Sequence, residues 1–174
     1  MNRLFAVLAA LGALVLTGCV DSAKPVLTNA KPVLGQHLRL QLYSLNQGFA
    51  GQPEQTEYVW KGTHYAHVSG SMTDVPGFTL HSFEGGDYIV QTRPNDPNDK
   101  IEYALLHPFI DGVYYAAVID EDDANAKVRA ANCRKVKDSS CRIETREQLF
   151  ALARASAARP RDRGGLAIRL PNKK

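Results

Sequence analysis

Three copies of one pattern, an aromatic residue, a glycine and a tyrosine, constrain the fold of this chain more than any other feature. In each copy an apolar-rich run ends at the aromatic residue, the glycine follows, and a second run begins at the tyrosine. The copies span residues 60–65, 83–88 and 109–115. Glycine supplies the positive φ that tight hairpin turns require. The pattern predicts three β-hairpins, formed by residues 57–60 with 64–69, 78–83 with 87–92, and 101–109 with 113–119.

Further strands are indicated on both sides of these hairpins. Residues 38–43 alternate apolar and polar side chains, which is typical of a half-buried strand, and residues 166–170 follow a Gly-Gly turn. Short strands at regular spacing favour an antiparallel β-sandwich or barrel. The predicted class is therefore mainly β (α+β), with residues 127–132 leading into another strand.

One helix is expected near the C-terminus. Thr145 and Gln148 have the spacing of a capping box, in which each side chain bonds to the other residue's backbone amide. Apolar residues follow at helical spacing until Pro160, which cannot continue a helix. The sequence predicts a helix over residues 146–158.

The N-terminal sequence predicts where the protein is located and gives no indication of its activity. Arg3 precedes an uncharged apolar run, residues 4–16, which is too short to span a bilayer and fits a signal peptide. The run ends in Leu16-Thr17-Gly18-Cys19, which resembles the lipobox of the bacterial lipoprotein signal class. The resemblance implies cleavage before Cys19 and acylation of that residue. The alternatives are an ordinary signal peptide with a chance cysteine, or an uncleaved anchor.

The expected organisation follows from this leader. Residues 1–18 form the signal peptide, residues 19–35 the lipidated cysteine and a tether, and residues 36–174 a single β-rich domain. The tether holds two copies of Lys-Pro-Val-Leu, whose prolines favour an extended spacer. Val20 rather than an aspartate follows the cysteine. By the sorting rule of enterobacterial lipoproteins, this favours the periplasmic face of the outer membrane.

Two cysteines remain once Cys19 is assigned to lipid. Cys133 and Cys141 form an even pair in an oxidising compartment, where disulfides persist. We expect them to be joined, as a bridge across the base of a hairpin that carries the basic residues Arg134, Lys135 and Lys137 at its tip.

Charge is unevenly distributed along the chain. Residues 19–126 hold 6 Lys and Arg against 14 Asp and Glu, a net charge of −8, whereas residues 127–174 hold 14 against 4, a net charge of +10. Either the two parts neutralise each other in the fold, or the basic part meets an anionic surface. For the second case, Arg134, Lys135 and Lys137 are the expected contact residues. The partners expected in an envelope are lipopolysaccharide, anionic lipid or an acidic envelope protein, rather than nucleic acid.

Local motifs of catalysis are missing from the sequence. It contains no Gly-x-Ser-x-Gly elbow, phosphate-binding glycine loop or His-Glu-x-x-His motif. His64 and His67 have a metal-like spacing, but an offset of three on a strand directs them to opposite faces. Two acidic runs lack the ligand spacing of a calcium loop; they contain Asp96, Asn98 and Asp99, and Asp120, Asp122 and Asp123. No metal, cofactor or catalytic residue is predicted.

These observations favour a non-enzymatic accessory or binding lipoprotein in envelope maintenance or assembly. One alternative is a periplasmic inhibitor of a hydrolase such as a lysozyme or protease, and another is a hydrolase whose catalytic site is not local in sequence. A lipocalin-like carrier fits less well, because that family places Gly-x-Trp at its first strand, whereas Trp60 precedes its glycine. A closed apolar cavity would favour a carrier, an exposed rigid loop an inhibitor, and a cleft with a histidine and an acid an enzyme.

Overall fold

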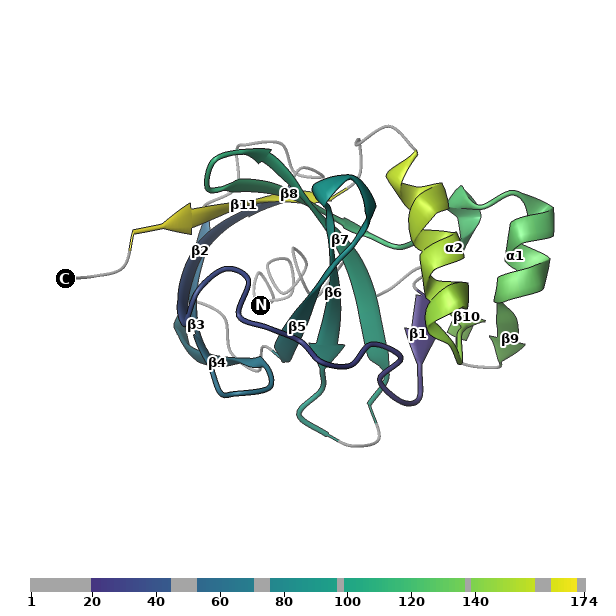
Figure 1. Cartoon of the computed structure of the whole chain (residues 1–174), viewed down its shortest axis with the longest axis horizontal. Coiled ribbons are helices and arrows are strands. Elements are labelled where there is room, and N and C mark those ends of the chain that lie inside the picture. The colour runs from purple at the N-terminus through teal and green to yellow at the C-terminus, as the bar shows by residue number, and fades with distance from the viewer. Residues whose placement is uncertain are drawn as a thin grey trace, which may run out of the picture.

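Eight antiparallel strands close into a barrel (Figure 1). The computed structural model describes residues 20–44, 53–70, 76–96, 99–136, 139–158 and 164–171. The barrel strands are β2 (His37–Ser44), β3 (Glu54–Trp60), β4 (Tyr65–Gly70), β5 (Gly77–Ser82), β6 (Tyr88–Arg93), β7 (Ile101–Ile110), β8 (Val113–Val118) and β11 (Gly165–Leu170). Each pairs with the next, and β11 closes the ring between β8 and β2. Of the two architectures that the strand pattern allowed, the chain adopts the barrel.

All three predicted hairpins are confirmed. β3 pairs with β4, β5 with β6, and β7 with β8, each antiparallel across its expected turn. The turn glycines adopt the left-handed backbone that the pattern predicted, with φ of 83° at Gly62 and 73° at Gly112. A residue with a Cβ would be strained at either position.

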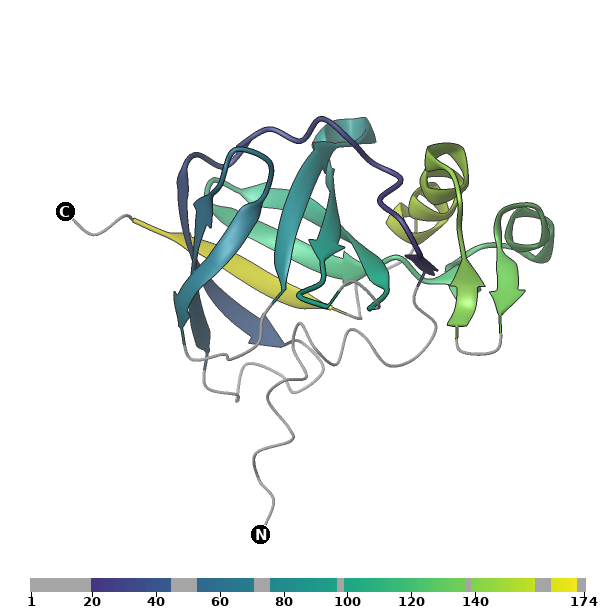
Figure 2. The same ribbon diagram turned by 90° about the horizontal axis from the view of Figure 1, so that it is seen from below.

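A small side sheet and two helices pack beside the barrel (Figures 1 and 2). β1 (Val20–Ser22) pairs with the first residues of β7; β10 (Ser139–Arg142) lies parallel to β1, and β9 (Arg134–Val136) completes a hairpin with β10. The helices are α1 (Ala126–Asn132) and α2 (Arg146–Ala157). α2 is the predicted C-terminal helix, and its capping box between Thr145 and Gln148 is formed. No helix in the described part of the chain is long and apolar enough to span a bilayer.

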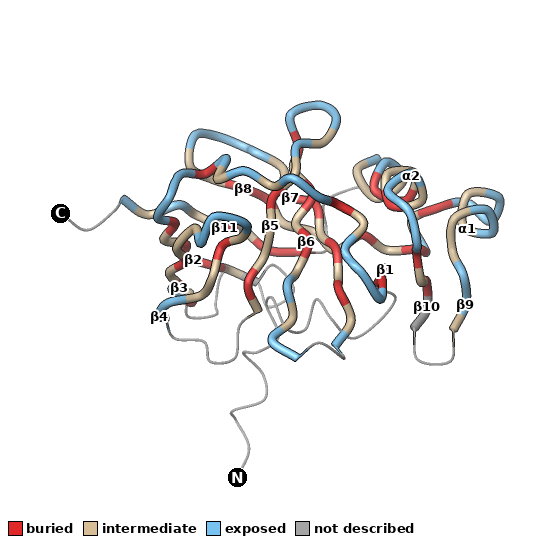
Figure 3. Tube along the Cα trace, turned by 60° about the horizontal axis from the view of Figure 1, so that its bottom comes forward, coloured by how far each residue is buried: buried red, intermediate tan, exposed pale blue. Residues whose placement is uncertain are grey.

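Two apolar cores result from the alternation of side chains along the strands. The barrel interior is filled by Leu38, Leu40, Tyr58, Leu80 and further residues of the same faces. The outer faces of β6 and β7 contribute Ile89, Tyr103 and Leu105 to a second core, closed by Leu149 and Leu152 of α2. Figure 3 shows buried stretches along β7, and the neighbours Leu105 and Leu106 of this strand belong to the outer core and to the barrel core, respectively. This strand therefore joins the barrel to the helical side of the domain.

The segment interpreted as a tether is part of the fold, so that prediction was wrong. Val20 is fully buried in β1, and Leu27 and Leu34 occupy the outer core and the barrel core. Residues 23–36, the N-terminal strap, run between these points. Gln91 bonds both backbone groups of Leu27. The prolines prevent ladder pairing, but the apolar residues between them supply enough burial to hold the strap in place.

Residues 127–132 lead into strand β9, as expected, but they form most of helix α1, which was not predicted. Asn125 caps this helix by accepting a hydrogen bond of 3.0 Å from the Val128 amide. Arg129 of the helix reaches back to Asp122 at 2.7 Å. The cap and the alanines of the segment favour a helix over a strand.

Candidate functional site

The basic hairpin tip is present but only partly described. Arg134 and Lys135 lie exposed on β9, and Lys137 lies outside the described residues. Arg134 pairs with Glu144 at 3.3 Å, with both side chains largely exposed. A pair of this kind is weak in water, so Arg134 remains available to another anion. Lys135 has no ion pair among the described residues.

Among the residues that the structure describes, three ion pairs join the acidic and the basic parts of the chain, as the neutralisation alternative expects. Arg142 bonds buried Asp21 at 2.9 Å, Arg129 bonds Asp122, and Arg154 binds both carboxylate oxygens of Glu84. Asp21 is only 3% exposed and also has Lys100 at 3.6 Å. These arginines are therefore used within the fold.

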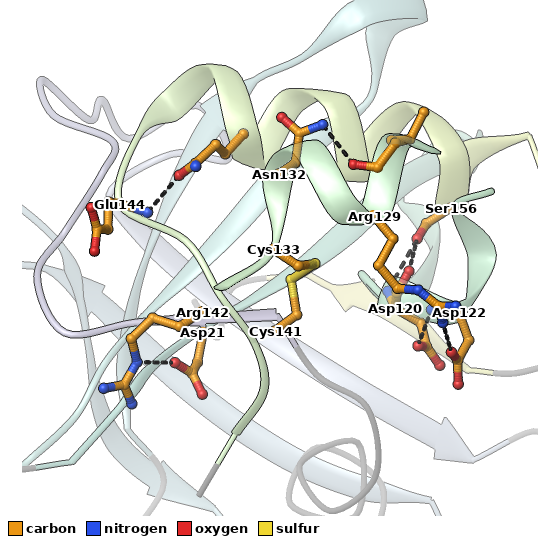
Figure 4. The surroundings of a disulfide bond; sticks show 12 residues. Asp21, Asp120, Asp122, Arg129, Asn132, Cys133, Cys141, Arg142, Glu144 and Ser156 are labelled. Atoms are coloured by element: carbon orange, nitrogen blue, oxygen red, sulfur yellow. Dashed lines mark hydrogen bonds and ion pairs between the residues drawn. A yellow bond between two sulfur atoms is a disulfide. The ribbon is translucent and has the colours of Figure 1, made fainter. Parts of the chain in front are cut away.

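Cys133 and Cys141 form the predicted disulfide, which links the end of α1 to β10 (Figure 4). The carboxylate of Glu121 lies beside it, and one ligand atom of each of the three residues falls within 4.8 Å of the others. Both sulfur atoms are used by the disulfide, so the cluster offers a metal only one carboxylate. Burial, with a smaller contribution from Asp122, raises the pKa of Glu121.

The histidines do not form one site. His64 lies in the first hairpin turn beside Arg93, at 2.9 Å, whereas His67 faces the barrel interior next to Tyr58. His107 of β7 pairs with buried Asp87, the residue just before β6. An acid that orients an imidazole is one element of hydrolase sites, but no described nucleophile bonds to His107.

An apolar cavity of about 90 Å³ lies inside the barrel. One part of its wall consists of small residues on three neighbouring strands: Ala104 on β7, Ala116 on β8, and Gly165 and Ala167 on β11. Leu40 and Leu42 on β2, the strand next to β11, and Tyr58 on β3 continue the lining. The small side chains on β7, β8 and β11 leave space that the core does not fill.

Polar groups are gathered on the β3–β4 side of the interior. Glu54 and Thr56 face inward because their register partners are Leu42 and Leu40. The polar atoms Glu54 Oε2, Thr56 Oγ1 and His67 Nε2 are buried and make no hydrogen bond of normal geometry with the described residues. The Tyr58 ring connects this group to the cavity, since it lines the cavity and meets the His67 ring edge-on, with centroids 5.6 Å apart.

Burial controls the ionisation of this interior. It raises the pKa of Glu54, so the carboxyl retains its proton to higher pH than in water. Burial also raises the pKa of Tyr58 to about 12, against a smaller opposing effect of the nearby Thr56 hydroxyl. The interior therefore favours neutral groups.

An exposed apolar pair stands at the tip of the β7–β8 hairpin. Phe109 is 69% exposed and Ile110 is 63% exposed, and the turn beyond them is held by a hydrogen bond from the Arg169 amide to the Gly112 carbonyl at 2.7 Å. Large apolar side chains presented on a short rigid hairpin suit insertion into a partner's pocket.

The cavity and its polar neighbours were not predicted from the sequence. The alternation of Leu38, Leu40 and Leu42 indicated an inward face of one strand. The same alternation at Glu54 and Thr56 was the signal from which inward-facing polar groups could have been predicted. Comparisons with protein-family models, with curated proteins and with solved structures found no match to this chain.

Proposed function

We propose that this chain is a lipid-anchored, non-enzymatic binding protein of a bacterial cell envelope, and that its barrel takes the slender apolar part of a small ligand. The observation that carries the proposal is the apolar cavity of about 90 Å³ inside a closed barrel. An eight-stranded barrel is just wide enough to enclose one small ligand.

The size of the cavity limits the ligand. An apolar cavity of about 150 Å³ accommodates a benzene molecule, so a rigid space of about 90 Å³ accommodates about four carbon atoms. A segment of an acyl chain or a small branched group fits this volume. Glu54 Oε2 and Thr56 Oγ1, on the same inward face of β3 as the cavity residue Tyr58, are buried without a hydrogen-bond partner among the described residues, and suit a ligand that carries a hydroxyl group.

The anchor places the domain at the membrane in this proposal. Cys19 immediately precedes Val20, which is fully buried and pairs with Cys141 of β10. A lipidated Cys19 would therefore hold the domain against the bilayer without a spacer. The β9–β10 hairpin, with Arg134 and Lys135, lies in the same small sheet. This arrangement favours contact of the basic residues with anionic lipid, lipopolysaccharide or an acidic envelope protein, on the periplasmic face of the outer membrane.

The cavity is tested with linear alcohols from ethanol to octanol, by calorimetric titration of the purified chain. Each methylene that enters the cavity adds about 0.8 kcal/mol, or about fourfold in Kd. We expect the affinity to rise up to about butanol and then to level off. Ala116→Leu, which fills the cavity, should abolish binding, whereas Ala66→Leu on the outward face of β4 should not.

Because overpacking can destabilise a core, melting curves accompany these variants, and Ala167→Val provides a milder filling. A Kd that does not depend on chain length, or that is unchanged in folded Ala116→Leu and Ala167→Val, would contradict the carrier proposal.

The anchor is tested by metabolic labelling with a tagged fatty acid in the expressing bacterium. Wild type should carry the label, and Cys19→Ala should not. Label that persists on Cys19→Ala would exclude Cys19 as the acylated residue.

The exposed pair on the β7–β8 hairpin favours a second candidate, the hydrolase inhibitor. In that case Phe109 or Ile110 occupies a pocket of the enzyme, and changing both to serine should abolish inhibition of a lysozyme or protease panel without lowering the melting temperature. Wild-type protein that inhibits no enzyme of the panel would argue against this candidate.

A further inference from the structure

A groove of about 430 Å³ lies on the outer surface, between the N-terminal strap, the end of β5 and the first turn of α2. Its volume falls within the range of about 300–1,000 Å³ typical of small-molecule sites. The groove is separate from the barrel cavity, with which it shares only the wall residue Leu80.

The groove carries positive charge without a compensating acid. Lys31 of the strap and Arg146 of α2 line it, and no Asp or Glu does. Neither cation makes an ion pair or hydrogen bond with the described residues. Arg154, two turns further along the same helix, is by contrast bound to Glu84. Lys31 and Arg146 therefore remain free to bind an anion.

Arg146 is positioned by an aromatic side chain. Its guanidinium carbon lies 4.6 Å from the centroid of the Phe150 ring. Stacking of this kind leaves the N–H groups at the edge of the guanidinium unused, in the planar arrangement that binds two oxygens of a phosphate. Phe150 is itself held edge-on against Phe83, with centroids 5.1 Å apart.

The walls of the groove are fixed before any ligand binds. Gln91 holds Leu27 of the strap at 3.0 Å, and the Tyr65 hydroxyl accepts a hydrogen bond from the Leu34 amide at 3.1 Å. On the β5 side His81 is half-buried and bonds Thr79 at 2.9 Å. Burial and the charge of Arg146 lower the pKa of His81. At neutral pH the groove therefore presents two positive charges and a neutral imidazole.

We propose that this groove binds a small organic phosphate monoester, with the phosphate between Lys31 and Arg146 and the organic body against Leu80 and Phe150. A phosphate monoester carries a charge of about −1.5 to −2 at neutral pH, which matches the two unpaired cations better than a single carboxylate does. Leu80, Phe150 and the apolar strap residues Val26 and Val33 provide the apolar part of the wall. The proposal uses neither the barrel cavity nor the lipid anchor, and so goes beyond the proposed function.

The test is calorimetric titration of the purified full-length chain with phenyl phosphate, inorganic phosphate and benzoate. We expect phenyl phosphate to bind at least tenfold tighter than either of the others. Arg146→Gln and Lys31→Gln should each weaken it about tenfold or more, and Arg146→Lys should recover only part of the loss. Arg154→Gln, the control on the same helix, should stay within about twofold of wild type. Raising the salt concentration should weaken binding, since the charges are exposed.

A lipid headgroup is the other source of the same chemistry. The binding of wild type and of Arg146→Gln is therefore measured on vesicles of phosphatidylcholine with and without phosphatidic acid. Membrane binding through the N-terminus is the same in both proteins, so a difference between them reports on Arg146 alone. The proposal predicts no difference between the two proteins. It would be overturned by a difference seen only on phosphatidic acid, by equal affinity for benzoate and phenyl phosphate, or by folded Arg146→Gln and Lys31→Gln proteins that bind phenyl phosphate like wild type.

Discussion

Removing one hydroxyl should release the N-terminal strap from the barrel. The Tyr65 side chain is fully buried, and its hydroxyl accepts from the Leu34 amide at 3.1 Å and donates to the Gly35 carbonyl at 2.9 Å. Tyr65→Phe leaves the buried Leu34 amide without a partner, which costs about 1–3 kcal/mol. The Gly35 carbonyl is partly exposed and can turn to water. We expect a loss of about 2 kcal/mol in the free energy of unfolding, or about 4–8 °C in Tm.

Urea unfolding of the full-length chain measures this loss. Tyr88→Phe is the matched control, because Tyr88 is a half-buried tyrosine of the same barrel that makes no hydrogen bond with the described residues. It should change stability by less than about 0.5 kcal/mol. Hydrogen exchange adds a local readout, since the Leu34 amide should exchange faster in Tyr65→Phe. Equal stabilities of the two variants, with an unchanged Leu34 amide, would refute the role assigned to this hydroxyl.

Three further changes examine other parts of the fold. Replacing Cys133 and Cys141 by alanine should lower stability by roughly 2.5 kcal/mol through loss of the loop constraint, and identical urea midpoints with and without reductant in wild type would contradict this. Burial raises the Glu54 pKa above its ordinary 4.5, so the stability due to its protonated form is complete below pH 4.5 and is lost as pH rises through the folded-state pKa. Glu54→Gln should remove this loss of stability at rising pH, so the stability of the variant relative to wild type should be higher at pH 7 than at low pH. Parallel curves of stability against pH for the two proteins would count against this prediction. Thr145→Ala removes the side-chain cap of α2 and should cost about 1 kcal/mol, measured by thermal melting against Thr63→Ala in an exposed turn.

The elements that could be predicted are those specified by neighbouring residues. Each hairpin needs only a turn glycine and two apolar runs, and all three formed where the pattern placed them. The capping box of α2 is likewise complete within residues 145–148. Barrel closure could not be predicted from neighbouring residues, because it requires β11 to pair with β2 across more than half of the chain. A sandwich and a barrel share the same alternation along each strand.

One error and one omission have a common physical origin. The strap was interpreted as a spacer from its prolines, and the helical form of residues 127–132, which do lead into strand β9 as expected, was not predicted. Both segments take their structure from distant partners. Leu27 is held by Gln91, and Leu34 by Tyr65. Helix α1 is followed by its C-cap residue Cys133, whose disulfide attaches the helix to β10. Local propensity is a weak guide where such tertiary contacts decide the conformation.

The two candidate binding sites also depend on partners far apart in sequence. The barrel cavity exists because Ala104, Ala116 and Ala167, on three different strands, come to face one wall, and no one of these strands is unusual by itself. In the outer groove, Lys31 and Arg146 are separated by most of the chain and line one groove only because the strap runs past the end of β5 and the start of α2. The basic residues singled out from the sequence lie on one local hairpin, where the nearest acid, Glu144, is also local. Charge that is contiguous in sequence therefore pointed to the tip, whereas the two cations that line one groove come from the strap and α2, which are far apart in sequence.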